Sequence, residues 1–101
     1  MNNKIEIVSI SGTVYIKPEI LYTLDKKKLV SFLLEHIVEE LGQMTDYLTV
    51  ISEGETGDLV MDDLKKGDKI SIEGELESTQ SIENMKRFVF MKMNSYQKIK
   101  E

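Results

Sequence analysis

The fold is decided by residues 46–77, which read DYLTVISEGETGDLVMDDLKKGDKISIEGELE. The segment opens with residues 46–52, whose β-branched and aromatic side chains predict a strand. Residues 53–58, EGETGD, follow with the composition of a turn. After this turn, the apolar residues are first spaced as in a helix and then alternate as in a strand. This order of strand, helix and strand limits the folds that the chain can adopt.

A short helix and a strand complete this segment. Residues 59–64, LVMDDL, have apolar side chains within one and a half helical turns, and Gly67 suits the end of such a helix. Residues 69–77, KISIEGELE, alternate strictly between apolar and polar positions, which predicts a half-buried strand. Its apolar row would consist of Ile70, Ile72, Gly74 and Leu76.

The chain before this segment begins with residues 4–16, KIEIVSISGTVYI, which are dense in isoleucine and valine. The apolar parity changes between Ile7 and Val8, which indicates a bulge or a strand buried on both sides at that point. Gly12 suits a bend in the strand. We therefore expect one long, curved first strand.

The remaining segments are two connections and two strands. Residues 17–28 form the first connection, because Pro18 interrupts regular pairing. Residues 29–38 predict a strand to about residue 37, although the run LLEHIVEELG also fits a helix. Residues 78–86 are a polar loop, and residues 87–96 predict the last strand.

Three strands, a short helix and two further strands are the layout of the OB-fold, a five-stranded Greek-key barrel. We therefore predict an all-β chain whose residues 1–101 form a single OB-fold domain. The long bent first strand supports this, because barrel closure requires one strand to serve both sides of the curve. An unrelated five-stranded sandwich or α+β sheet is the alternative.

Composition excludes several classes of function. The 101 residues contain no cysteine and one histidine, His36, which leaves no disulfide framework, thiolate site or histidine-rich metal site. No apolar run approaches a membrane span, and the N-terminus lacks a signal-peptide profile, so we expect a cytoplasmic protein. We find no catalytic arrangement, phosphate loop or metal-ligand spacing, and expect neither an enzyme nor a cofactor.

The charge pattern qualifies the formal net charge of −5, which argues against general adhesion to nucleic acid. An OB-fold presents ligands to its second and third strands, between the loops that join strands 1–2 and 4–5. Seven of the 13 basic residues lie in or beside those two predicted loops: Lys17, Lys26, Lys27, Lys28, Lys86, Arg87 and Lys92. The acidic residues are expected elsewhere, before and on the helix and on strand 69–77. The alternative is that lysines favour solvated loops in any protein.

Aromatic residues could provide stacking platforms for bases. The candidates for exposed rings are Tyr22 in the first loop and Tyr47 on the third strand. Phe88 is a third candidate, and Phe90 lies on the same face of the last strand, where we expect one of the two to be buried. We expect about half of the aromatic candidates, which include Phe32, to belong to the core.

These segments resemble the bacterial single-stranded DNA-binding protein family over about residues 4–99. IKPEILYT resembles the family's first strand and loop, SFLLEH its second strand, and DYLTVI with LKKGDKISIEGEL its third strand, turn and fourth strand. SGTV near residue 12 and FLLEH followed by VEE are similar to primosomal replication protein N, a dimeric relative. The order and spacing of these pieces make the resemblance specific.

The resemblance implies an OB-fold, sequence-tolerant binding of single-stranded DNA, and roles in DNA replication, recombination or repair. It also implies a homo-oligomer, with a homodimer expected and a tetramer as the alternative, and replication proteins as partners. The chain departs from the family in that the position of a stacking tryptophan falls near Glu53, and the arginine of a Gly-Arg-Leu strand is Glu75. Residues that are basic in the primosomal relative fall on Gln80 and Ile82.

Two function hypotheses follow. The leading one is a single-stranded DNA-binding protein in which the seven basic residues contact phosphates and Tyr22, Tyr47 and Phe88 stack on bases. The alternative is an OB-fold protein-interaction module of a replication or mobile-element complex that has lost DNA binding. Its partner surface would carry Glu73, Glu75 and Glu77.

Overall fold

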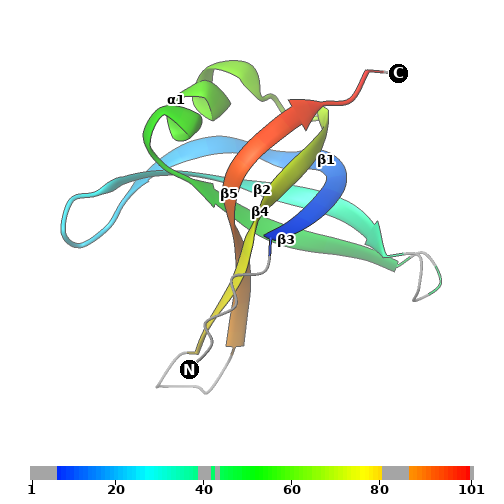
Figure 1. Cartoon of the computed structure of the whole chain (residues 1–101), viewed down its shortest axis with the longest axis horizontal. Coiled ribbons are helices and arrows are strands. Elements are labelled where there is room, and N and C mark those ends of the chain that lie inside the picture. Colours follow the sequence, from blue (N-terminus) through cyan, green and yellow to red (C-terminus); the bar gives the residue numbers. More distant parts are fainter. Residues whose placement is uncertain (1–6, 39–41, 43, 81–86, 101) are drawn as a thin grey trace.

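The computed structural model describes residues 7–38, 42, 44–80 and 87–100. Its strands close into a barrel in the order β1-β2-β3-β5-β4, with one helix between β3 and β4 (Figure 1). The elements are β1 (Ile7–Tyr22), β2 (Lys28–Val38), β3 (Met44–Ser52), α1 (Gly54–Asp63), β4 (Lys69–Gln80) and β5 (Arg87–Lys98). This architecture confirms the predicted OB-fold.

The first strand is long and curved, as predicted. Its first half pairs with β4 and its second half with β2, and Thr13 has a partner on both strands. A Cβ atom on Gly12 would lie 2.3 Å from the backbone oxygen of Glu35. Only glycine permits this approach, so Gly12 lies where β1 passes from one partner strand to the other.

Two expectations about the first strand were wrong. Pairing with β4 is regular through Ile7 and Val8, and Ile7 is exposed. The register shifts lie later, between Val14 and Ile16 and between Ile16 and Glu19. Pro18 lies within the second shift, so it interrupts regular pairing as expected, but it does not end the strand.

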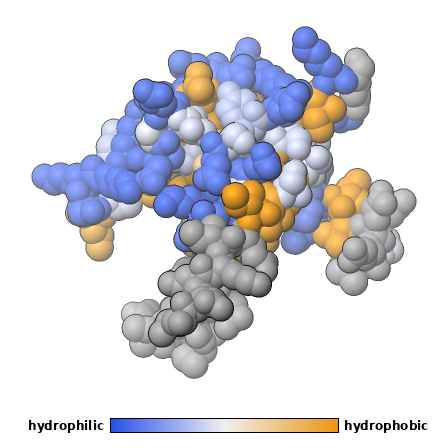
Figure 2. Space-filling view, in the orientation of Figure 1, coloured by the Kyte–Doolittle hydropathy of each residue, from blue (hydrophilic) through white to orange (hydrophobic). Residues whose placement is uncertain are grey.

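The predicted connection at 17–28 is correspondingly too long. The strand continues to Tyr22, and only residues 23–27 join β1 to β2. Lys17 therefore lies on a strand and not in a loop. The β1–β2 hairpin extends beyond the barrel wall (Figure 1), and hydrophilic residues cover most of it in Figure 2.

The strand prediction for residues 29–38 is confirmed, and the helical alternative is wrong there. The helix, in contrast, begins at Gly54, so residues 54–58 of the predicted turn at 53–58 are helical and the predicted helix at 59–64 starts too late. Gly57 is buried, and its missing side chain lets α1 pack against Val30 and Ser52. The backbone there needs small residues for packing, which makes the sequence resemble a turn.

The core lies inside the barrel and under the helix. Its buried apolar residues are Val14, Val30, Phe32, Leu34, Leu48, Val50, Val60, Leu64, Ile70, Ile72, Met91 and Met93. The helix contacts β1, β2 and β3. Because Val60 and Leu64 project from the helix and its C-cap into this cluster, α1 covers one end of the barrel.

The fourth strand follows its predicted alternation only in part. Ile70, Ile72 and Gly74 are buried, but Leu76 is 44% exposed. The register with β5 shifts between Glu73 and Gly74, and Leu76 lies beyond this shift. The strand also continues to Gln80, so residues 78–80 of the predicted loop at 78–86 belong to β4, and residues 81–86 lie outside the described residues.

Candidate nucleic-acid interface

The outer face of β1, β2 and β3 is formed by the residues that alternate with the core. On β2, burial of Phe32 and Leu34 turns Leu33 outward. Leu33 pairs with Ile16 on β1 and with Thr49 on β3, and Thr49 pairs with Phe90 on β5. The sheet therefore presents a continuous row of mostly apolar side chains across four strands.

An aromatic pair lies on this face. The rings of Tyr15 and Tyr47 have centroids 4.9 Å apart and are tilted by 58°. Both residues remain exposed, at 44% and 47%. Desolvation, followed by the nearby Glu35 carboxylate, raises the pKa of Tyr47. Two tilted, exposed rings form a platform for a flat ligand.

Two hollows mark the same face. One of about 170 Å³ lies between β1 and β2, with Leu33 and Thr49 in its wall and Lys17 beside it. The other, of about 250 Å³, is lined by the apolar side chains Leu29, Ile51 and Phe90, with Thr23, Lys27, Glu53, Glu77 and Lys92 around them. The second hollow combines an aromatic ring with cations.

The lysines of this second hollow are paired with a carboxylate. Lys27 Nζ lies 2.7 Å from Glu53 Oε2, and Lys92 Nζ lies 3.5 Å from Glu53 Oε1. Lys28 Nζ contacts Asp58 Oδ1 at 3.1 Å. The expectation that the acidic residues collect away from the basic ones is therefore wrong, because the start of α1 packs beside the β1–β2 loop.

The loop itself is a compact turn. The Thr23 backbone N–H donates to the Lys27 carbonyl at 2.9 Å, and the Lys27 N–H donates to the Thr23 hydroxyl at 3.0 Å. Lys26 has a φ of 66°, a left-handed conformation uncommon for a residue with a side chain. Tyr22 is 69% exposed beside this turn, and Leu24 projects fully into solvent.

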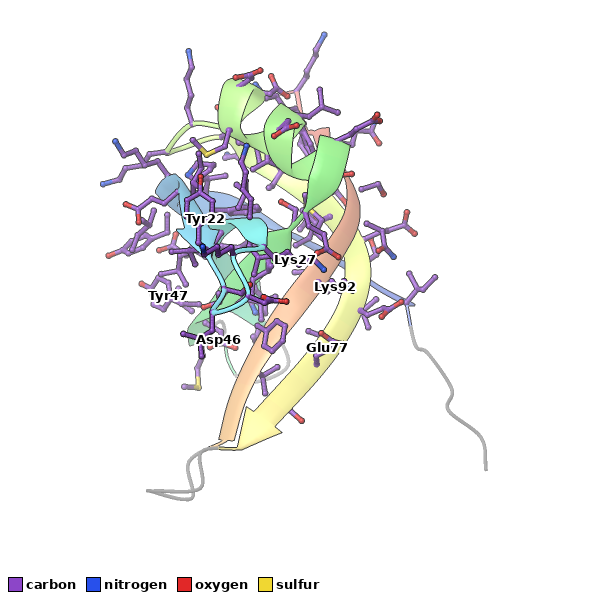
Figure 3. All side chains as sticks on the ribbon, turned by 90° about the vertical axis from the view of Figure 1, so that its left-hand side faces the viewer. Tyr22, Lys27, Asp46, Tyr47, Glu77 and Lys92 are labelled. Atoms are coloured by element: carbon purple, nitrogen blue, oxygen red, sulfur yellow. The ribbon has the colours of Figure 1, made fainter. Side chains whose placement is uncertain are left out.

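The structure brings some of the predicted site residues together and separates others. Lys27 and Lys92 meet at Glu53 and lie side by side in Figure 3. Lys28 points toward α1, whereas Lys17 and Lys26 form no ion pair with any residue that the structure describes.

The remaining predicted residues differ in burial, and some of them are not described by the structure. Phe32 is buried in the core, and Phe90 is half-buried on the outer face. Lys86 and the side chains of Arg87 and Phe88 lie outside the described residues.

Sequence reasoning missed Tyr15 on this face, and it considered Glu53 only as the residue near the family's stacking-tryptophan position, not as a partner of lysines. Alternation from the inward Val14 points Tyr15 outward, but its contact with Tyr47 depends on the register of three strands. Glu53 follows the third strand directly, and this position could have indicated that it lies at the edge of the face.

Two further features do not change this picture. His36 Nε2 lies 3.5 Å from Asp46 Oδ2, and the other Asp46 oxygen accepts a hydrogen bond from the Tyr47 backbone N–H at 2.9 Å. Within residues 7–38, 42, 44–80 and 87–100, no group of three metal-binding side chains converges, and no helix could traverse a lipid bilayer.

A closed OB barrel with rings and cations on its outer sheet face belongs to a class that binds extended polymers. The model of the "Single-strand binding protein family" matches residues 5–96, and the chain belongs to this family. No curated protein matches the sequence.

A small single-stranded DNA-binding protein from Streptomyces coelicolor has a similar structure. It superimposes with a TM-score of 0.77 over 97% of this chain and 96% of that one, at 13% identity. At this identity the likeness establishes the shared fold.

Proposed function

We propose that this protein binds single-stranded DNA along the outer face of β1, β2 and β3, largely independently of sequence. One observation carries the proposal: in a chain of the single-strand binding family, this face has the Tyr15–Tyr47 ring pair together with the Lys27–Lys92 cations. Rings stack on bases of any sequence, and cations hold the backbone. Such a face suits a strand that changes its sequence from site to site.

The proposed roles divide by chemistry. Tyr47 and Tyr15 stack on bases near one end of the face, and Phe90 supports a base in the larger hollow, while Tyr22 and Phe88 extend the stacking surface. The phosphates contact Lys17, Lys26, Lys27, Lys28, Lys86, Arg87 and Lys92. Because single strands are bound mainly through charge and stacking, both sets contribute to affinity.

We further propose a cytoplasmic protein of DNA replication or recombination that acts as a homodimer, or as a tetramer, with replication proteins as partners. The family membership and the segments similar to the primosomal relative support this setting. The name of the Streptomyces neighbour also supports binding of single-stranded DNA. The proposed activity is binding and not catalysis.

Titration of labelled oligo-dT at two salt concentrations tests the proposal. We expect salt-sensitive binding, with a log–log slope near −0.7 for each phosphate neutralised. The chain has four tyrosines and no tryptophan, so quenching of tyrosine emission reports stacking directly. A duplex of equal length should bind more weakly.

A protein that shows no salt-sensitive binding to oligo-dT at low ionic strength would contradict the proposal. Recovery of replication proteins from a nuclease-treated lysate by such a protein would favour the interaction-module hypothesis instead. The two results are distinguishable because the first uses purified components alone.

A further inference from the structure

Glu53 lies at the junction of β3 and α1, and its carboxylate binds two lysines of the proposed DNA face. The two carboxylate oxygens serve different partners, Lys27 at 2.7 Å and Lys92 at 3.5 Å. Lys27 comes from the β1–β2 loop and Lys92 from β5, and Figure 3 shows them next to each other. One carboxylate therefore bridges two segments that are distant in sequence.

This side chain is not needed to begin the helix. Glu53 is the N-cap residue of α1, yet its side chain makes no capping hydrogen bond. Its backbone carbonyl accepts from the Gly57 N–H at 3.3 Å, and any residue could supply that group. The Lys27 ammonium, followed by Lys92, lowers the pKa of Glu53, and the positive end of the helix favours the same ionised form.

A DNA phosphate would use the same partners as this carboxylate. Both groups present anionic oxygens, and a lysine ammonium donates equally well to either. The side chains of Lys27 and Lys92 are 57% and 47% exposed, so a phosphate can reach them. Ion pairs this exposed are weak, which leaves them easy to exchange.

We propose that Glu53 is a built-in competitor of the DNA phosphates. In the free protein it occupies Lys27 and Lys92, and in the complex it yields them while its own charge still repels the backbone. The electrostatic attraction is therefore kept low, and tight binding depends on bases that stack on the outer face. This inference rests on the proposed function, because it concerns the same face.

Glu53→Gln tests the competition, because it removes the charge and keeps the size. We expect about tenfold tighter binding of oligo-dT at low salt, as one unit charge a few ångströms from phosphate gives this order of effect. The salt dependence should steepen by about 0.7, because one unit of opposing charge is removed. Inorganic polyphosphate, which has no bases, should gain at least as much.

Asp63→Asn is the matched control. Asp63 holds Lys98 at 2.9 Å at the other end of the helix, away from the outer sheet face. Its removal breaks a comparable ion pair and changes the net charge by the same amount. The control should leave the affinity for oligo-dT within about twofold of the parent.

The outcomes separate this inference from the proposed function. If the parent binds oligo-dT and a folded Glu53→Gln protein binds equally or more weakly, the inference is overturned and the proposed function stands. If neither protein binds any single strand, both fail. If Glu53→Gln does not fold, Glu53→Ser supplies a favoured N-cap without the charge and should show the same gain, and an absence of gain overturns the inference.

Discussion

Two clusters of lysine and carboxylate lie at opposite ends of α1 and differ in what surrounds them. At the end of the helix, Lys98 contacts Asp63 and Asp68 and donates to the Asp63 carbonyl at 2.8 Å, while the Tyr96 hydroxyl donates to the Asp63 carboxylate at 2.9 Å. At the start, Glu53 holds lysines beside the apolar hollow.

The comparison shows that a lysine–carboxylate pair does not by itself reveal whether it stabilises the fold or serves a ligand. The pair at the helix end has further partners in the Tyr96 hydroxyl and in the Asp63 carbonyl, which the last helical turn leaves free. The pair at the helix start shares its hollow with Phe90 and Ile51, and its lysine ammonium groups contact the Glu53 carboxylate. The first cluster therefore stabilises the fold, and the second remains available to a ligand.

Substitution of Gly74 would disturb both clusters and has the largest expected effect. A Cβ atom there would lie 2.3 Å from the Lys92 carbonyl oxygen, so β5 would have to move. We expect Gly74→Val to cost roughly 3 kcal/mol of unfolding free energy and to lower Tm by roughly 12–24 °C. Thermal denaturation measures this, with Ser71→Val on the same strand as the control. An unchanged Tm would show that the close approach is not real.

Removal of a stacking ring should affect only the DNA face. Tyr47→Ala should weaken binding to oligo-dT by at least fivefold, since base stacking is worth about 1–3 kcal/mol per base. Fluorescence anisotropy measures the affinity. Tyr96→Phe is the control, because Tyr96 belongs to the cluster at the other end of the helix. Equal affinities for the two variants would refute the assignment of the face.

Neutralising lysines at the two ends should give unequal results. The double variant Lys27→Gln with Lys92→Gln should bind about tenfold more weakly at low salt and flatten the salt dependence by roughly 1.4. The double variant Lys98→Gln with Lys100→Gln should change affinity by about twofold or less, because both lysines lie away from the outer face. Binding isotherms at several salt concentrations measure the affinity of both double variants. If both variants lose affinity equally, the two lysine clusters do not differ in DNA binding.

The smallest expected effect is on stability, and it comes from the Tyr96 hydroxyl in the cluster at the helix end. Burial, followed by the Asp63 carboxylate, raises the pKa of Tyr96 to about 12. Because the folded pKa lies above the unfolded value of about 10, this stability is complete below pH 10 and is lost as pH rises toward 12. Tyr96→Phe should cost about 1 kcal/mol at neutral pH.

This last prediction can be tested by measuring stability between pH 10 and pH 12. The difference in unfolding free energy between the parent and Tyr96→Phe, from urea denaturation, should shrink between pH 10 and pH 12. A difference that stays constant across that range would mean that the hydroxyl does not interact with Asp63 in the folded state.

The sequence was sufficient for the order of elements, because the alternation of Ile70 and Ile72 and the apolar spacing around Val60 depend only on local periodicity. It was misleading at Gly54 and Gly57, which belong to the helix: Gly54 begins it with a φ of 65°, and Gly57 packs against Val30 and Ser52. It also failed at Pro18, since a bulge in a paired strand tolerates a residue that lacks an N–H. These errors concern contacts between segments, which local patterns do not contain.

The site was less predictable than the fold for the same reason. The predicted exposure of Tyr22 and Tyr47 is confirmed, although Tyr22 was expected in a loop and lies at the end of β1. The Tyr15–Tyr47 contact, however, depends on the bulges of β1, and the pairing of Glu53 with Lys27 and Lys92 depends on how three segments meet. The net charge of −5 does not predict these local arrangements of charged side chains.

The position of the bound strand can be measured by following the backbone amide signals of isotope-labelled protein during titration with oligo-dT. We predict that the shifts concentrate on the outer face, at Tyr15, Tyr47, Ile51 and Lys92, while the signals of Asp63 and Lys98 stay in place. Shifts centred on Lys98, or on the glutamates of β4, would contradict the assignment of the DNA-binding face.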